Sequence, residues 1–143
     1  MSTAALLCLV IAVSDGDTLT VRCAARRPER VRIVAIDAPE LRQAFGRQAR
    51  ENLKRLCFRQ RAELHTLGRD AYGRHLARVR CAGQDVATAQ VAAGLAWLST
   101  RQPAQYRDLA ALQARAQAAR IGLWSQARPM APWDYRRRYP AKR

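Results

Sequence analysis

The sequence predicts an α+β fold in which helices accompany a small β-barrel, and three observations support this prediction. β-Rich runs bounded by turn residues fill much of the N-terminal half, an amphipathic helical pattern interrupts them, and two further helical patterns follow. Strands with helices inserted between and after them fit a barrel-based α+β domain. The 143 residues match the usual size of one domain, so we expect a single domain over residues 1–143.

The first expected element is a β-hairpin. Residues 8–13 and 18–23 are rich in strand formers, and Ser14, Asp15, Gly16 and Asp17 between them have the composition of a tight turn. A third run, residues 31–36, is almost wholly apolar and ends before Pro39. Because such a run suggests burial on both faces, it favours a closed or nearly closed barrel.

Helices are expected in three places. Apolar residues recur at helical spacing over residues 44–58, with cations on the other face. Asp85 is a suitable N-cap for a helix that runs to about Leu95. A last helix is expected to begin near Pro103 and to end at Gly122. Its predicted inner stripe consists of Leu109, Leu112, Ala116 and Ala119.

A second hairpin is expected between the first two helices. Residues 61–66 and 75–81 are its strands, and residues 68–73 are its turn. Ala77, Val79 and Cys81 form the inward face of the second strand. Residues 127–143 are read as a basic C-terminal tail, for which a solvated surface and a nucleic-acid-binding arm are both open.

The four cysteines argue for disulfides rather than for zinc. No Cys-x-x-Cys pair is present and there are two histidines, which is a poor ligand set for zinc. A two-residue turn at Asp15 and Gly16 would place Cys8 opposite Cys23, so we expect these two to pair in an oxidising compartment. Cys57 and Cys81 fit a second disulfide and two small buried side chains equally well.

The charge of the chain points to a polyanionic partner. Lys and Arg number 26 against 11 Asp and Glu, which gives a net charge of +15. Such a field attracts nucleic acid, although a membrane-surface protein or an arginine-favouring genome would give the same composition. The apolar run at residues 4–13 is too short to span a bilayer and lacks the preceding basic residues of a signal peptide.

Two acidic clusters stand at strand ends in a chain that has few acids. One contains Asp15 and Asp17, and the other contains Asp37 and Glu40. Either cluster alone is typical of an ordinary turn or polar loop, but a barrel could bring them together as an oxygen site for a hard cation. Phosphodiester hydrolysis needs a cation on a non-bridging oxygen, a base for the attacking water and donors for the developing charge.

Two arginines and a tyrosine complete the candidate set. Arg32 and Arg74 could bind a phosphate through planar guanidinium groups that stay charged at any working pH. Tyr72, in the turn before Arg74, could stack on a base or sugar. Taken separately, each arginine also fits a solvated surface position.

In series, these segments resemble the three signature segments of the staphylococcal nuclease (thermonuclease) family. They are residues 15–18 (DGDT), Arg32 with residues 36–40 (IDAPE), and residues 70–74 (DAYGR). Residues 94–96 and 122–125 also look like family segments, so the resemblance covers about residues 8–126. It implies a five-stranded barrel of the oligonucleotide-binding type with three helices, one bound Ca²⁺, and endonuclease action on DNA and RNA that leaves 3′-phosphate ends.

The resemblance also implies a role for each residue. Asp17 and Asp37 match the metal carboxylates, and Ala38 matches a residue that offers its backbone carbonyl to the metal. Glu40 matches the general base. The phosphate-binding arginines of the family correspond to Arg32 and Arg74, and a nucleotide-contacting tyrosine corresponds to Tyr72. Position 38 is threonine in the best-known members, but a carbonyl ligand does not depend on the side chain.

Further expectations concern partners and alternatives. After Leu95 the family often has nucleotide-contacting tyrosines, for which Trp97 or Tyr106 would have to substitute. The resemblance and the cysteine pairing favour a secreted or periplasmic protein, and the resemblance implies action on single-stranded or duplex DNA and RNA. No membrane binding is expected, and a monomer is the default expectation. A non-catalytic nucleic-acid-binding module and an interaction protein with a basic surface are the alternatives, and neither needs the Asp17, Asp37 and Glu40 set.

Overall fold

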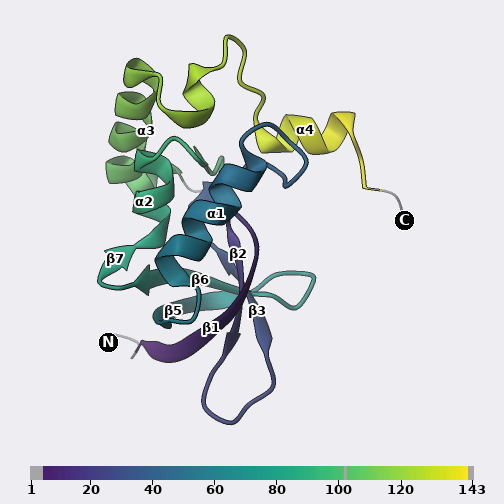
Figure 1. The fold of residues 1–143 in the computed structure, drawn as a ribbon, viewed down its shortest axis with the longest axis vertical. Helices are drawn as coiled ribbons and strands as arrows, with labels where there is room; N and C mark the ends of the chain where they lie inside the picture. The colour runs from purple at the N-terminus through teal and green to yellow at the C-terminus, as the bar shows by residue number, and fades with distance from the viewer. Residues whose placement is uncertain (1–4, 102, 142–143) are drawn as a thin grey trace.

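The computed structural model describes residues 5–101 and 103–141 and contains a closed β-barrel (Figure 1). Five strands form the barrel in the order β3-β2-β1-β5-β6, and a parallel pairing of β3 with β6 closes it. The strands are β1 (Leu6–Asp15), β2 (Thr18–Arg22), β3 (Glu29–Ile33), β5 (Arg61–Arg69) and β6 (His75–Cys81). This confirms the predicted α+β fold and the barrel of the oligonucleotide-binding type.

The first hairpin has its turn at Gly16 and Asp17, one residue later than expected, because Asp15 pairs with Thr18. Two register shifts farther along β1 offset this displacement, as bulges do when they add a residue to one strand. The strands therefore still bring Cys8 to Cys23, and the two are joined by a disulfide. A second disulfide joins Cys57 at the end of α1 to Cys81 at the end of β6.

The apolar run at residues 31–36 is not one strand, which corrects the expectation. β3 ends at Ile33, and a short strand β4 (Ile36–Asp37) begins after a bend at Ala35, whose φ of 76° lies in the left-handed region. β4 then pairs with β8 (Trp97–Leu98) instead of extending the barrel. The bend carries Asp37 out of the barrel wall and towards the loop that leads to α1.

Helix α1 (Gly46–Cys57) lies across the barrel and buries the inward residues Ala49, Leu53 and Leu56 (Figure 1). Gly16 in the hairpin turn is required by this packing, because a Cβ there would lie 2.6 Å from that of Ala49 and 2.7 Å from that of Ala38. Close packing of this kind leaves no room for a side chain. The first hairpin turn is therefore held against α1.

The remaining helices differ from expectation in length and number. The helix capped by Asp85 is α2 (Val86–Ala92), shorter than predicted, and is preceded by a short strand β7 (Gln84–Asp85). A 3₁₀ turn, η1 (Pro103–Tyr106), leads into α3 (Arg107–Ala119), and a second one, η2 (Gly122–Ser125), follows it. In α3 Leu109 and Ala116 are buried, but Ala119 is exposed, so the predicted inner stripe does not reach the end of the helix.

The C-terminal segment is not simply a solvated tail, and it supplies a fourth helix where three were expected. Helix α4 (Pro132–Arg138) lies near the N-terminal end of α1, apart from the α2 and α3 pair (Figure 1). Pro132 occupies the first turn, where a missing N–H costs little. Among the described residues, no helix reaches the length and apolar character that crossing a membrane requires.

Candidate active site

A cavity of about 840 Å³ opens at the end of the barrel where β1 and β3 finish. It collects most of the candidate residues from elements that are distant in the sequence. Six of the predicted site residues line it: Asp17, Arg32, Asp37, Glu40, Tyr72 and Arg74. The barrel thus brings the two acidic clusters together, as hypothesised from the sequence.

Asp17 is held in the first hairpin turn by several donors. It is 6% exposed, and its Oδ2 accepts a 2.7 Å hydrogen bond from the backbone N–H of Ala38. Thr18 Oγ1 donates to Oδ1 at 3.2 Å. Burial raises the pKa of Asp17 to about 8, the positive charge of Arg32 opposes that rise, and the negative charge of Asp15 adds to it.

Asp37 and Arg32 form the second part of the site. Asp37 is 8% exposed, and Arg32 Nη2 lies 3.4 Å from its Oδ1 and 3.3 Å from Asp17 Oδ2. Arg32 Nη1 donates to the backbone carbonyl of Ile36 at 3.0 Å and also to that of Ile33. Arg32 does lie on the face opposite its buried neighbours in β3, but this face looks into the cavity rather than into open solvent.

Glu40 lies in the loop before α1 and meets an arginine that the sequence reasoning did not select. Arg136, on α4, donates from Nη1 to Glu40 Oε1 at 2.7 Å. It also donates to both oxygens of Asp37, from Nη2 at 2.8 Å and from Nη1 at 3.2 Å. The hydrogen bonds to Asp37 raise the pKa of Arg136 further above its ordinary value. Three neighbouring arginines in a basic C-terminal segment gave no signal to distinguish Arg136.

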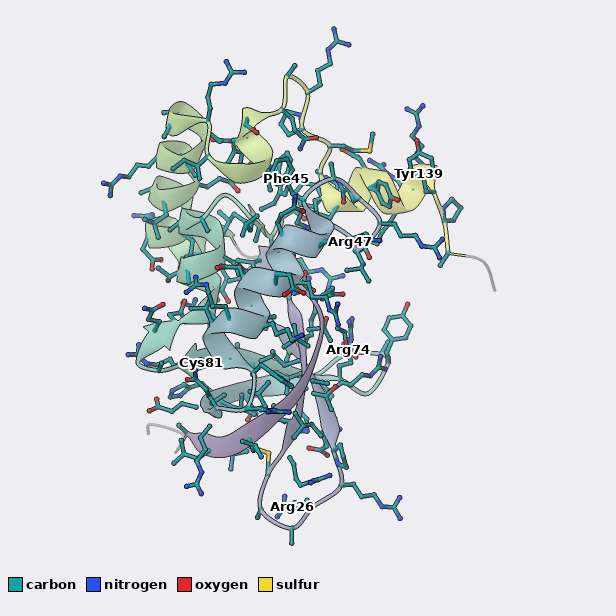
Figure 2. The ribbon with its side chains drawn as sticks, viewed as in Figure 1. Arg26, Phe45, Arg47, Arg74, Cys81 and Tyr139 are labelled. Carbon is teal, nitrogen blue, oxygen red and sulfur yellow. A yellow bond between two sulfur atoms is a disulfide. The ribbon has the colours of Figure 1, made fainter. Side chains whose placement is uncertain are left out.

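Arg74 and Tyr72 approach the cavity from the turn between β5 and β6. Asp70 accepts from Arg74 Nε at 2.7 Å and from the backbone N–H groups of Arg74 and Tyr72 at 2.9 Å, which shapes the turn. The Arg74 guanidinium lies 5.7 Å from the centre of the Tyr72 ring, and Tyr72 is 78% exposed. In Figure 2, Arg74 lies between α4, at the upper right, and the loop that carries Arg26, at the bottom.

The aromatic residues after Leu95 take different positions. Tyr106 lines the cavity, as does Trp133 of α4. Trp97 instead packs between two tryptophans, with ring centres 4.5 Å from Trp124 and 5.5 Å from Trp133. Of the two residues considered as substitutes for the nucleotide-contacting tyrosines, Tyr106 therefore has the better position.

The donor set fits a hard cation with oxygen ligands. Two buried carboxylates, Asp17 and Asp37, converge on one positively charged nitrogen of Arg32, so the site already favours positive charge between them. Within residues 5–101 and 103–141, no three His, Cys, Asp or Glu side chains form a metal cluster. The predicted ligand set has two carboxylates and the Ala38 carbonyl, and water would have to complete it.

Fold and site together define a barrel protein of the oligonucleotide-binding type, with acids and arginines gathered at one end. The family described as "Staphylococcal nuclease homologue" matches residues 30–126, and the chain belongs to this family. The chain is 37% identical over 130 residues to an "uncharacterized endonuclease" of Haemophilus influenzae, covering 91% of this chain and 72% of that protein. It is 36% identical over 139 residues to a "micrococcal nuclease" of Shigella flexneri, covering 90% and 79%.

A plant relative matches a smaller share of its own length. The "probable staphylococcal-like nuclease CAN1" of Oryza sativa is 34% identical over 108 residues, which are 76% of this chain and 32% of that protein. The similarity thus spans most of this chain in proteins of different overall length.

Proposed function

We propose that this chain is a calcium-dependent endonuclease that hydrolyses phosphodiester bonds in DNA and RNA and leaves 3′-phosphate ends. The observation that carries the proposal is the meeting of Asp17, Asp37 and Glu40 with Arg32 and Arg74 around one cavity. Family membership and the nuclease names of similar proteins support a hydrolase that acts on nucleic acid. The net charge of +15 supports a polyanionic substrate.

Glu40 is proposed as the general base. Its side chain is 36% exposed at the cavity, so a water molecule can reach the carboxylate. Glu40 would accept a proton from this water as the water oxygen attacks phosphorus. The P–O5′ bond then breaks, and the addition of one water gives a 3′-phosphate and a 5′-hydroxyl.

Arg32 and Arg74 are proposed to bind the reacting phosphate. Both line the cavity, and their side chains are 19% and 25% exposed, which leaves them accessible but partly desolvated. Charge-assisted hydrogen bonds from partly buried guanidinium groups are stronger than those in open water. They would stabilise the negative charge that grows on the phosphoryl oxygens.

Asp17, Asp37 and the backbone carbonyl of Ala38 are proposed to hold the cation. When bound, Ca²⁺ would supply a positive charge that polarises a non-bridging oxygen of the phosphate. The role of the two aspartates is to hold their oxygens in place at the cavity wall, which the hydrogen bond from Ala38 to Asp17 supports. A few carboxylates, a carbonyl and water suit the larger and more flexible ion.

We also propose that the protein acts as a monomer in an oxidising compartment, secreted or periplasmic. Two disulfides, Cys8–Cys23 and Cys57–Cys81, support the oxidising compartment, because such bonds persist where the surroundings are oxidising. The first bond ties β1 to the residue after β2 and the second ties α1 to β6, and none of the four cysteines lines the large cavity.

The test is digestion of single-stranded DNA, duplex DNA and RNA by the wild-type chain and by Glu40→Gln, with Ca²⁺, Mg²⁺ or chelator. We expect cutting with Ca²⁺, no cutting with chelator, and turnover in Glu40→Gln that falls on the order of a hundredfold, as for loss of a general base. Labelled products would carry 3′-phosphates. Tight binding of nucleic acid without cutting under all conditions would instead support the non-catalytic binding module.

A further inference from the structure

Arg136 makes more contacts with the proposed site than its place near the C-terminus suggests. Its guanidinium donates to both oxygens of Asp37, at 2.8 and 3.2 Å, and to Glu40 at 2.7 Å. A single side chain therefore joins a proposed metal ligand to the proposed base. Arg136 lies beyond residues 30–126, which the family profile matches.

Helix α4 is fixed against the site by contacts independent of Arg136. Gln43 Nε2 donates to the Met130 carbonyl at 2.7 Å, and its Oε1 accepts from the backbone N–H of Glu40 at 3.0 Å. On the other side, Trp133 packs edge-on against Trp97, whose strand β8 pairs with Asp37 in β4. The segment before α4 is thus attached to the loop that carries Glu40, and the first turn of α4 packs on the strand that pairs with Asp37.

The contacts of Arg136 conflict with the role proposed for Asp37. A cation ligand must offer an oxygen lone pair, and most of the lone pairs of Asp37 are engaged, because both of its oxygens accept from Arg136 and Oδ1 also lies 3.4 Å from Arg32. A divalent cation on Asp37 would moreover stand beside the positive guanidinium, and like charges at such short range repel. Asp37 therefore cannot serve both partners fully at the same time.

We propose that Arg136 is a positioning residue of the active site, which holds Asp37 and Glu40 while no cation is bound and releases Asp37 when one binds. The inference rests on the proposed calcium site. Because the ion pair must be broken for the cation to enter, its free energy is subtracted from that of cation binding. Arg136 acts as an internal competitor of the cation.

The experiment measures the binding of Ca²⁺ alone to the full chain by titration calorimetry. Arg136→Gln removes the competitor, and we expect Ca²⁺ affinity to rise about fivefold, the upper end of the range for a partly exposed ion pair. Arg136→Lys should fall between, since one ammonium group cannot reproduce the planar, bidentate contact.

Arg137→Gln is the matched control. It removes the same charge from the next position of α4, but the Arg137 side chain is 79% exposed and pairs with Asp134 of its own helix. Its Ca²⁺ affinity should stay within about twofold of the wild type, because an exposed charge is screened. An equal rise in both variants would reduce the effect to net charge and would overturn the proposal.

The sign of the change in Ca²⁺ affinity distinguishes two roles of Arg136: exchange, in which the cation replaces Arg136 on Asp37, and support of the fold alone. If Arg136 only anchors α4, Arg136→Gln will lose thermal stability in chelator and will bind Ca²⁺ no more tightly than the wild type. This result would overturn the exchange but not the calcium site. Tighter Ca²⁺ binding and a larger Ca²⁺-induced rise in Tm support it. Absence of Ca²⁺ binding in the wild type and in Arg136→Gln would overturn both the exchange and the calcium site.

Discussion

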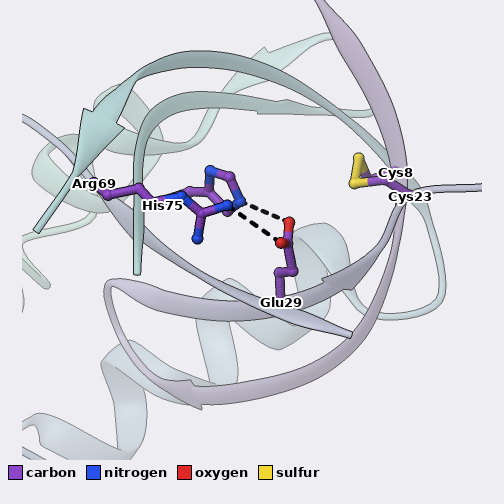
Figure 3. The surroundings of a disulfide bond; sticks show 5 residues. All are labelled: Cys8, Cys23, Glu29, Arg69 and His75. Atoms are coloured by element: carbon purple, nitrogen blue, oxygen red, sulfur yellow. Dashed lines mark hydrogen bonds and ion pairs between the residues drawn. A yellow bond between two sulfur atoms is a disulfide. The ribbon is translucent and has the colours of Figure 1, made fainter. Parts of the chain in front are cut away.

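The two ends of the barrel strands carry ion pairs of the same kind in opposite surroundings. The first residues of β1 line a smaller cavity of about 260 Å³, and its last residue lines the large cavity. From β3, Glu29 lines the smaller cavity and Arg32 lines the large one. At the smaller cavity Glu29 accepts from His75 at 2.6 Å and from Arg69 at 3.4 Å, near the Cys8–Cys23 disulfide (Figure 3).

The acids differ in burial and therefore in the direction of their pKa shifts. The Glu29 side chain is 39% exposed, and its hydrogen bond with His75 holds the pKa of Glu29 below the ordinary value. Asp17 is 6% exposed, and burial raises its pKa to about 8. A surface ion pair contributes little and costs little, whereas a buried carboxylate costs stability unless it is fully compensated. The acids at the large cavity are thus better explained by function than by stability.

The largest expected difference between the two ends is in activity. Asp37→Asn should lower the rate of nucleic-acid hydrolysis on the order of a thousandfold, because it removes a charge from the proposed cation site. Glu29→Gln should leave the rate within about twofold, since Glu29 lines the smaller cavity and its partners His75 and Arg69 do not belong to the proposed site. Initial rates on one oligonucleotide with Ca²⁺, with Tm as the check on folding, measure both. Equal losses in the two variants would contradict the division into a functional and a structural end.

The next effect concerns stability at the smaller cavity. Replacing Cys8 and Cys23 together by alanine removes a bond of sequence separation 15, and the free energy of unfolding should fall by about 3 kcal/mol. Guanidinium unfolding followed by tryptophan fluorescence measures it. Ca²⁺ affinity of the folded variant should not change, because the bond lies at the end of β1 that is remote from Asp17. A large loss of Ca²⁺ affinity would show that the two ends are coupled.

The sequence predicted the five side chains of the proposed site because four of them belong to short local motifs at strand ends, and the fifth, Arg32, lies in the apolar run that leads to Asp37. Asp17 is in a hairpin turn, Asp37 and Glu40 follow an apolar run, and Arg74 closes a second turn. Such motifs survive errors in element boundaries. The turn at Gly16 was displaced by one residue and the run at residues 31–36 was broken, yet the same side chains reach one cavity.

Features that depend on distant contacts could not be predicted in this way. The bend before β4 places Ala35 at a φ of 76°. An alanine does not favour this conformation, so the residue type gives no sign of the bend. Arg136 meets Asp37 across 99 positions of sequence. It does so because Trp133 packs on Trp97 and because Gln43 binds the segment before α4, and neither pairing has a local signature. Long-range packing of this kind selects one arginine from three neighbours.

The smallest expected effect is the pH dependence of the Glu29 pair. Its pKa is lowered in the folded state, so its contribution to stability is present above the ordinary value of 4.5 and is lost as the pH falls through the folded-state value. At neutral pH, Glu29→Gln should lower the free energy of unfolding by less than about 1 kcal/mol, because the Glu29 side chain is 39% exposed and solvent therefore screens its charge. The matched control is Glu63→Gln, because in the wild type the Glu63 carboxylate lies 3.9 Å from Arg80. Guanidinium unfolding at neutral and acidic pH measures the difference in free energy of unfolding between the wild type and Glu29→Gln. This difference should vanish in acid, and a difference that grew in acid would reverse the sign assigned to this pair.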